Sequence, residues 1–172
     1  GLGDVYKRQT YISLSAANFI NDIRLVAVVG GDFPKKTIYD LKERGIRTEG
    51  LQIKEAEKSF FWSGRYYNDM NSRDTLVTEL NVLEHFDPII PDSYQNSDYV
   101  MLGNLTPTVQ RQVIERLEKR PKLIAMDTMN FWMDIMLDEL KTTLSMIDIL
   151  LINYEEARHL SGEYSLVKAA RK

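Results

Sequence analysis

The sequence contains no cysteine. Disulfide bonds, thiolate metal sites and thiol nucleophiles are therefore excluded. Histidine is almost as scarce, because only His85 and His159 occur, and this predicts no histidine-rich metal cluster. Long apolar runs are also lacking, since the run at 147–152 is far shorter than the roughly 20 residues that a membrane-spanning helix needs. These absences favour an aqueous, reducing compartment, and we expect a cytoplasmic location.

An excess of positive charge is missing as well. The 172 residues carry a formal net charge of −3, with a pI near 5.5. Binding to nucleic acid or to an anionic membrane needs clustered basic side chains, so we expect neither partner. The composition that remains, 44% hydrophobic and 27% charged, is typical of a globular domain with one substantial core.

Both ends of the chain have the appearance of cuts. It begins at Gly1 without a methionine and ends at Lys172, inside a predicted helix that has no stop signal. Residues 1–9 show neither helical nor strand periodicity. We interpret them as a segment foreign to the domain, which we place at residues 10–172.

The first half of that domain begins with alternating helix and strand patterns. Residues 10–22 predict a buried helix from an apolar face that comprises Ile12, Ala16, Phe19 and Ile20. The β-branched run IRLVAVV predicts a buried strand that ends at Gly30-Gly31-Asp32. Residues 35–44 predict a second helix between Pro34 and Gly45, with Ile38 and Leu41 facing inward.

The middle of the chain, residues 51–80, differs in amino-acid composition. It mixes aromatic and β-branched residues with turn residues, which predicts short strands with at least one hairpin. We interpret this segment as a β insertion between α/β units.

The second half repeats strand and helix three times. The predicted strands end at Asn104, Asp127 and Asn153, and the predicted helices cover residues 107–120, 132–140 and the segment up to Leu160. Parallel neighbouring strands need crossover connections, which such repeats supply. We therefore expect an α/β fold: a three-layer, Rossmann-like parallel sheet flanked by helices, with a small β insertion.

A polar residue ends each convincing strand. These residues are Asp32, Asn104, Asp127 and Asn153. The carboxyl ends of parallel strands meet at one edge of the sheet, and ligands bind in the crevice there. Asp and Asn also cap helices and form turns, so each of the four has a purely structural alternative.

Asn153 and Glu156 form the sharpest of these patterns. They lie three residues apart at the start of a predicted helix, so both can project from its first turn. A carboxylate in that position is a hard oxygen ligand suited to Mg²⁺, and the helix N-terminus favours anions. The same spacing also fits a capping box, in which Asn153 caps the helix and Glu156 reaches back. Spacing alone leaves both interpretations open.

Several segments resemble ribokinase-like (PfkB-type) carbohydrate kinases. The segment DILLINYEEARHLSG resembles their Asn-x-x-Glu motif, in which a strand ends in Asn and Glu follows three residues later. Four further segments resemble pieces of the family in the same order, namely TYISLSAANF, VVGGDFP, VMLGNLTP and LIAMDTMNFW. The resemblance extends from about Thr10 to Lys172, and the Asn-x-x-Glu motif is its specific part.

This resemblance implies an ATP-dependent sugar kinase. Asn153 and Glu156 would organise ATP and Mg²⁺, with Glu156 nearest the metal. Residues on the sugar side would be Gly31, Asp32, Asn104 and Asp127. The β insertion at about 51–80 would be the family's lid, which covers the sugar and pairs subunits into a homodimer. Its aromatic residues, namely Phe60, Phe61, Trp62, Tyr66 and Tyr67, would exclude water, although aromatic residues also serve in ordinary core or dimer packing.

The sequence departs from the family in three places. The family's Gly-Gly run is missing before Thr10, and the Asn in Asp127-Thr128-Met129-Asn130 lies one residue further on than usual. The 172 residues also contain no Gly-Ala-Gly-Asp segment, whose Asp is the general base in the family. We therefore expect this chain to be an inactive fragment of a kinase. The alternatives are a non-catalytic α/β module that binds a sugar or a nucleotide, and a purely structural domain.

Overall fold

The computed structural model of the chain describes residues 7–66 and 73–172. They belong to two compact units, Gly1–Pro91 and Asp92–Lys172, which we call unit 1 and unit 2. Residues 1–6 of the segment expected to be foreign lie outside the described part of the chain. The next three residues begin helix α1 (Lys7–Ala16).

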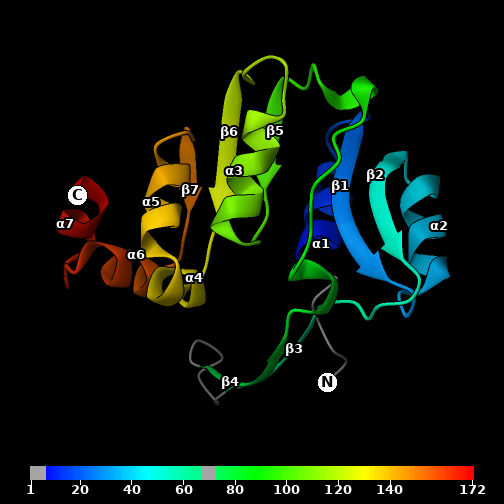
Figure 1. Ribbon diagram of the computed structural model, residues 1–172. Coiled ribbons are helices and arrows are strands. Elements are labelled where there is room, and N and C mark those ends of the chain that lie inside the picture. Colours follow the sequence, from blue (N-terminus) through cyan, green and yellow to red (C-terminus); the bar gives the residue numbers. More distant parts are fainter. Residues whose placement is uncertain (1–6, 67–72) are drawn as a thin grey trace. The chain divides into compact units, whose positions relative to one another are not determined.

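Unit 1 contains a βαβ motif followed by a hairpin (Figure 1). After α1 its elements are β1 (Ile23–Gly30), α2 (Lys35–Glu43), β2 (Ile46–Lys54), β3 (Phe61–Tyr66), β4 (Arg73–Glu79) and the short 3-10 helix η1 (Asn81–Leu83). Strands β1 and β2 are parallel, with Ile23 opposite Ile46 and Gly30 opposite Lys54. A parallel pair needs a crossover connection, and α2 provides it.

The predicted strand β1 and helix α2 are confirmed. Leu41 on α2 packs against Leu25 of β1 and Ile46 of β2, and these three residues form the core of the motif. Gly45 ends the helix with φ 76°, a conformation that glycine adopts without steric cost. Strand β2 has no counterpart among the predicted elements. It extends to Lys54, so the β insertion expected at about 51–80 starts after this strand.

The prediction of a buried helix over residues 10–22 is wrong at its C-terminal end. Helix α1 stops at Ala16, and Phe19 is 87% exposed in the turn that follows, with Ile20 also exposed. The side-chain amide of Asn18 donates to the carbonyls of Leu14 and Ser15, both at 3.2 Å. These bonds satisfy carbonyls of the last helical turn, which have no partners within the helix, so the chain can turn toward β1.

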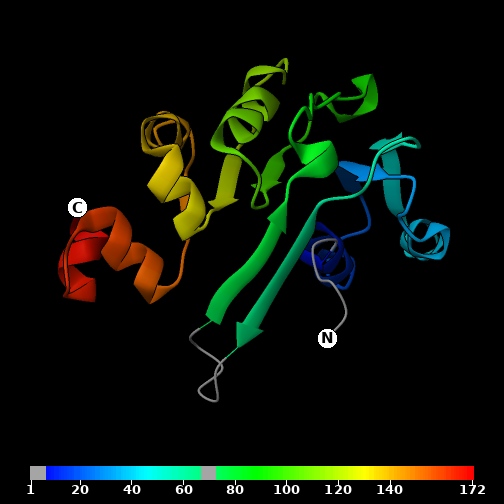
Figure 2. The same ribbon diagram turned by 60° about the horizontal axis from the view of Figure 1, so that its bottom comes forward.

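The hairpin expected in the insertion is confirmed. Strands β3 and β4 pair antiparallel, with Phe61 opposite Glu79 and Tyr66 opposite Arg73. Figure 2 shows them side by side as a two-stranded ribbon.

Unit 2 is built on a parallel sheet in the order β5-β6-β7. Its elements are η2 (Asp92–Tyr94), β5 (Tyr99–Leu102), α3 (Pro107–Glu115), β6 (Leu123–Asp127), α4 (Asn130–Ile135), α5 (Leu137–Leu144), β7 (Ile149–Leu151), α6 (Tyr154–Ser161) and α7 (Leu166–Arg171). The core lies around Ile124 and Met126 of the central strand, with Leu140 of α5 packed against them. Helices α3 and α5 pack on each other.

Two predicted helices of unit 2 differ from the observed ones. Helix α3 begins at Pro107, capped by the Thr106 hydroxyl, but ends at Glu115 and not at residue 120. The helix predicted at 132–140 is divided into α4 and α5, because Met136 adopts φ −140° and ψ 41°, outside the helical region.

The predicted α/β class, with parallel sheets flanked by helices, is confirmed. The parallel strands fall into two sheets, β1-β2 in unit 1 and β5-β6-β7 in unit 2. Among the described residues, no helix is both long enough and apolar enough to cross a membrane.

Candidate functional site

Three of the four predicted polar residues lie at one edge of the unit 2 sheet. Leu102, the last residue of β5, pairs with Met126 of β6, and Asp127, which ends β6, pairs with Leu151, the last residue of β7. Asn104 and Asn153 each follow two residues after the last residue of their strand. The register therefore brings Asn104, Asp127 and Asn153 to the carboxyl edge of β5-β6-β7, where parallel sheets bind ligands.

Asn104 is held by the segment that follows β6. Its Oδ1 accepts a hydrogen bond from the Trp132 indole N–H at 2.9 Å, and its Nδ2 donates to the Met129 sulfur at 2.9 Å. Trp132 is buried on α4, so its N–H needs this partner. These bonds fix the orientation of the Asn104 amide beside the end of β6. A contact between Asn104 and a substrate stays a prediction.

Gln110 ties together the ends of β5 and β6. This α3 residue is only 1% exposed, and its Nε2 donates to the carbonyl oxygens of Gly103 at 2.9 Å and Asp127 at 3.0 Å. The sequence reasoning missed Gln110. The sequence signal that could have identified it is a polar residue on the buried face of α3, beside Val109. A buried side-chain amide on such a face must find polar partners.

Two buried polar atoms of uncharged side chains at this edge lack hydrogen-bond partners among the described residues. They are Oε1 of Gln110 and Oγ1 of Thr128, and both residues are 1% exposed. A buried polar atom without a partner costs about 1–3 kcal/mol. Such atoms indicate where a water molecule or a ligand group would be bound.

Asn153 and Glu156 form a complete capping box at the start of α6. Asn153 Oδ1 accepts from the backbone N–H groups of Glu155 and Glu156, each at 2.9 Å. Glu156 Oε2 accepts from the Asn153 backbone N–H at 2.9 Å, and Glu156 is 5% exposed. The structural interpretation of this motif is therefore confirmed, while its role with ATP and Mg²⁺ stays a prediction. Among the described residues, no group of three or more Asp, Glu or His side chains could hold a metal ion.

Asp32, the fourth predicted residue, belongs to unit 1. Its Oδ1 accepts hydrogen bonds from the Ser59 backbone N–H at 2.8 Å and from the Ser59 hydroxyl at 2.7 Å. Partial burial would raise the pKa of the Asp32 carboxyl, but the bonds from Ser59 and from its own backbone N–H, with the charge of Lys58, lower the pKa overall. One oxygen of the carboxylate is thus engaged within unit 1. The neighbouring Gly31 has no room for a side chain, because a Cβ would overlap the carbonyl of Glu55.

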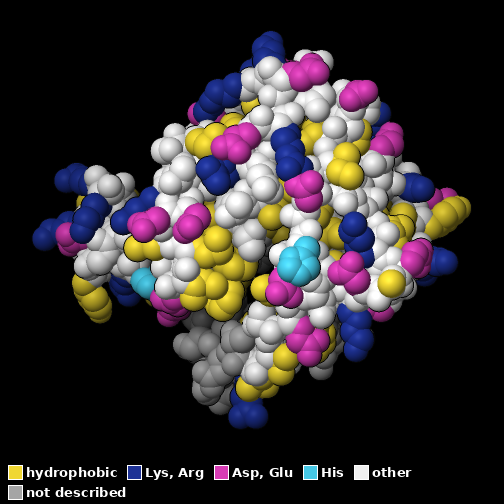
Figure 3. All heavy atoms as spheres, in the orientation of Figure 1, with side chains coloured by type: hydrophobic (Ala, Val, Ile, Leu, Met, Phe, Trp, Pro, Cys, Tyr) yellow, Lys and Arg dark blue, Asp and Glu magenta, His cyan; other side chains and the backbone are white. Residues whose placement is uncertain are grey.

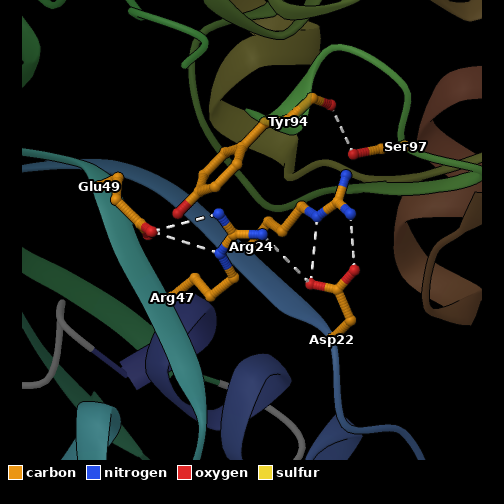
Figure 4. Close-up of polar contacts among 6 residues, drawn as sticks. All are labelled: Asp22, Arg24, Arg47, Glu49, Tyr94 and Ser97. Carbon is orange, nitrogen blue, oxygen red and sulfur yellow. Dashed lines mark hydrogen bonds and ion pairs between the residues drawn. The ribbon is translucent and has the colours of Figure 1, made fainter. Parts of the chain in front are cut away.

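A cluster of paired charges lies at the opposite, amino ends of β1 and β2 (Figure 4). Arg24 donates to both carboxylate oxygens of Asp22, at 3.1 and 2.6 Å, and Arg47 Nη2 lies 3.3 Å from Glu49 Oε1. The bond from Arg24 is the main cause that lowers the pKa of Asp22, against the opposing effect of burial. Because carboxylates lie beside both arginines, this cluster does not offer an open anion site.

The visible surface agrees with the low net charge. On the face drawn in Figure 3, Lys and Arg side chains are interspersed with Asp and Glu side chains. No broad basic area is seen on that face.

Solved kinases share this fold. The fructokinase of Halothermothrix orenii matches with a TM-score of 0.73 and 14% identity, over 94% of this chain and 62% of that structure. The nucleoside kinase of Methanocaldococcus jannaschii, an archaeal member of the ribokinase family, matches with a TM-score of 0.68 and 16% identity, over 95% of this chain and 54% of that structure. A candidate ribokinase II from E. coli in complex with ATP and Mg²⁺ matches with a TM-score of 0.68 and 16% identity, over 95% of this chain and 56% of that structure.

No protein-family model and no curated protein matches the sequence. The chain spans 54–62% of the length of these three structures. The resemblance drawn from the sequence is confirmed at the level of the fold: the chain has the fold of ribokinase-family kinases over part of their length.

Proposed function

We propose that the chain is part of an ATP-dependent kinase that transfers the γ-phosphate of ATP to a hydroxyl group of a carbohydrate. One observation carries the proposal. Asn104, Asp127 and Asn153 lie at the carboxyl edge of one parallel sheet, in a fold shared with a fructokinase and a nucleoside kinase. That edge is where open α/β sheets bind ligands.

Asn153 and Glu156 would serve the nucleotide. The N-terminus of α6 has a positive dipole end that favours phosphate, while the N–H groups of Glu155 and Glu156 already donate to Asn153. Glu156 offers one hard carboxylate oxygen, and no larger acidic cluster is present among the described residues. This donor set fits Mg²⁺ held chiefly by phosphate and water, because magnesium typically takes only one or two carboxylates from the protein. When bound, the ion would neutralise charge on the transferring phosphate.

Asn104 and Asp127 would face the carbohydrate. We do not propose a carbohydrate contact for Gly31 and Asp32, because the Asp32 carboxylate is bonded to Ser59 within unit 1. The β3–β4 hairpin would act as the lid that shields the acceptor from water, with Phe61 and Trp62 on β3 among its aromatic residues. The hairpin would also be the surface through which two subunits pair. Tyr67 lies outside the described residues, as does the side chain of Tyr66.

The general base would lie on a Gly-Ala-Gly-Asp segment, which these 172 residues do not contain. Phosphoryl transfer depends on positioning and on charge stabilisation around the phosphoryl group. We therefore propose that the chain alone has no sugar-dependent ATP turnover, and that a longer protein containing this segment has it. Turnover by the 172-residue chain would contradict the first statement.

A second candidate is a non-catalytic module that binds a sugar or a nucleotide. It is compatible with the capping box, because Asn153 and Glu156 satisfy each other without a metal ion or a nucleotide. Titration of the longer protein with a panel of sugars, with and without Mg-ATP, separates the two. A kinase consumes ATP in the presence of one of the sugars, whereas a binding module shows heat of binding without ADP production.

The substitution Glu156→Gln sharpens this test. Glutamine can still accept the bond from the Asn153 N–H, so the cap is retained while the negative charge is removed. Under the kinase proposal, turnover at limiting Mg²⁺ falls on the order of tenfold or more, with an unchanged unfolding midpoint. Glu155→Gln is the matched control, because Glu155 is an exposed neighbour on the same helical turn. Equal effects of the two substitutions would argue against a metal role for Glu156.

A further inference from the structure

The β3–β4 hairpin has little packing of its own. Among the described residues, its two strands pack mainly on each other (Figure 2). Large apolar side chains on both strands are exposed, namely Phe61, Leu76 and Val77. The direction in which the hairpin projects must therefore be set where its two strands join the rest of unit 1.

The strand that enters the hairpin is fixed at Ser59, two residues before β3. Ser59 is 3% exposed, and its hydroxyl accepts a hydrogen bond from the Gly30 backbone N–H at 2.8 Å. The same hydroxyl and the Ser59 backbone N–H both donate to Asp32. Three hydrogen bonds thus join the entry of the hairpin to the carboxyl end of β1.

The strand that leaves the hairpin is fixed at Asn81, two residues after β4. The Asn81 Nδ2 donates to the carbonyl oxygen of Ser59 at 2.9 Å, and the Val82 backbone N–H donates to the carbonyl of Lys58 at 3.2 Å. Asn81 has φ 47°, a left-handed conformation that asparagine tolerates better than most residues. The exit of the hairpin is therefore bonded to its entry.

We infer that Asp32, Ser59 and Asn81, which we call the hairpin anchor, set the direction of the β3–β4 hairpin. Asp32 is then a positioning residue, because it acts through Ser59 on the hairpin. The anchor is inferred from hydrogen bonds within unit 1. Its consequence for catalysis, that it places the lid over the acceptor, rests on the proposed kinase function.

Hydrogen exchange of the 172-residue chain tests the anchor without any activity. In Asp32→Ala, backbone amides of residues 61–66 and 73–79 are expected to exchange about tenfold faster, because two hydrogen bonds to a carboxylate are lost. Exchange in β5, β6 and β7 stays unchanged. Asp32→Asn keeps an acceptor oxygen in place and restores most of the protection.

The matched control is Asp40→Ala. Asp40 is an exposed carboxylate of unit 1 that pairs with Lys36 on the surface of α2, so its loss leaves hairpin exchange unchanged. Unchanged hairpin exchange in Asp32→Ala, or an equal increase in Asp40→Ala, would overturn the inference. If Asp32→Ala does not fold, Asn81→Gly replaces it, because glycine keeps the positive φ and removes only the bond to Ser59. Absence of faster hairpin exchange in that variant would overturn the inference in the same way.

Kinetics of the longer protein separate the anchor from the proposed function. With a sugar that supports turnover, Asp32→Ala is expected to raise KM for the sugar severalfold more than it lowers kcat, and Asp32→Asn to restore KM. No turnover by the unsubstituted longer protein, combined with faster hairpin exchange in Asp32→Ala, would remove the kinase proposal and leave the anchor standing. Turnover combined with unchanged hairpin exchange would remove the anchor alone.

Discussion

The carboxyl ends of β1 and β6 use polar groups in opposite ways. At the end of β1, the Ser59 hydroxyl and the Asp32 carboxylate bond to each other, and Ser59 also bonds to the Gly30 backbone. At the end of β6, Gln110 bonds through its nitrogen to the carbonyls of Leu102, Gly103 and Asp127, but its oxygen and the Thr128 hydroxyl have no partners among the described residues.

Whether a buried polar group has a hydrogen-bond partner distinguishes structural residues from candidate ligand-binding residues better than the residue type does. A buried polar group whose bonds are all made within the chain stabilises one conformation, whereas a buried group left without a partner costs free energy until something binds it. The polar groups at the end of β1 therefore have a structural role, which is to hold the hairpin. The end of β6, beside Asn104 and Asp127, is the better place to search for a ligand or an ordered water.

The largest effect is expected from Gln110→Ala. It leaves the carbonyls of Gly103 and Asp127 without their donor and opens a cavity, so the free energy of unfolding should fall by about 2–4 kcal/mol. Urea unfolding followed by circular dichroism measures this. Gln112→Ala on the same helix is the control, because Gln112 is only half-buried. If the two substitutions cost the same, Gln110 does not join the strand ends as described.

Ser59→Ala comes next. It removes a buried hydroxyl that serves both Gly30 and Asp32, and the expected loss is about 2 kcal/mol of unfolding free energy. Ser15→Ala, at an exposed position of α1, should change it by less than about 0.5 kcal/mol. An equally small effect of Ser59→Ala would mean that the end of β1 is not a structural site, and the comparison would fail there.

Acidification should weaken both units by a smaller amount. In unit 2, the hydrogen bond from Arg120 is the main cause that lowers the pKa of Asp148 below 3.8, assisted by the Ile124 backbone N–H and opposed by burial. A carboxyl whose pKa is depressed by folding stabilises the fold above its unfolded pKa, and this contribution is lost as the pH falls through the folded pKa. Urea midpoints should therefore decrease below a pH of about 4. Asp148→Asn should flatten that decrease for unit 2, and an unchanged pH profile would contradict the assignment.

The smallest effect is expected from Thr128→Val. If the hydroxyl has no partner, its replacement by a methyl group of similar shape should leave the unfolding free energy within about 0.5 kcal/mol, or raise it. A loss of more than about 1 kcal/mol would show that the hydroxyl is bonded to a water molecule or another group. Thermal unfolding with and without added sugar and Mg-ATP distinguishes a ligand from a permanent water.

The sequence predicted features that depend on neighbouring residues better than it predicted contacts between distant residues. The strands that end at Gly30 and Asp127 follow from continuous apolar runs, and the alternative of a capping box at Asn153 follows from a spacing of three residues. Strand β2 was missed because Glu49 and Gly50 interrupt its apolar pattern. Each of these outcomes depends on residues close together in the sequence.

The partners of the candidate site residues could not be predicted in the same way. Ser59 lies 27 residues from Asp32, and Trp132 lies 28 residues from Asn104. No periodicity or spacing rule connects such residues, because their contact depends on how the whole unit folds. The sequence therefore identified polar strand ends, while the distinction between bonded and unbonded ends needed the structure.

The close approach of backbone at the end of β1 also restricts how this protein can vary. A Cβ at Gly30 would overlap the backbone of residues 57–59, and one at Gly31 would overlap the carbonyl of Glu55. Neither obstacle is a flexible side chain that could move aside. In a library covering every position of the chain and screened for folding, these two sites should therefore accept no residue but glycine, while the exposed cap position Asn153 should accept other cap-forming residues.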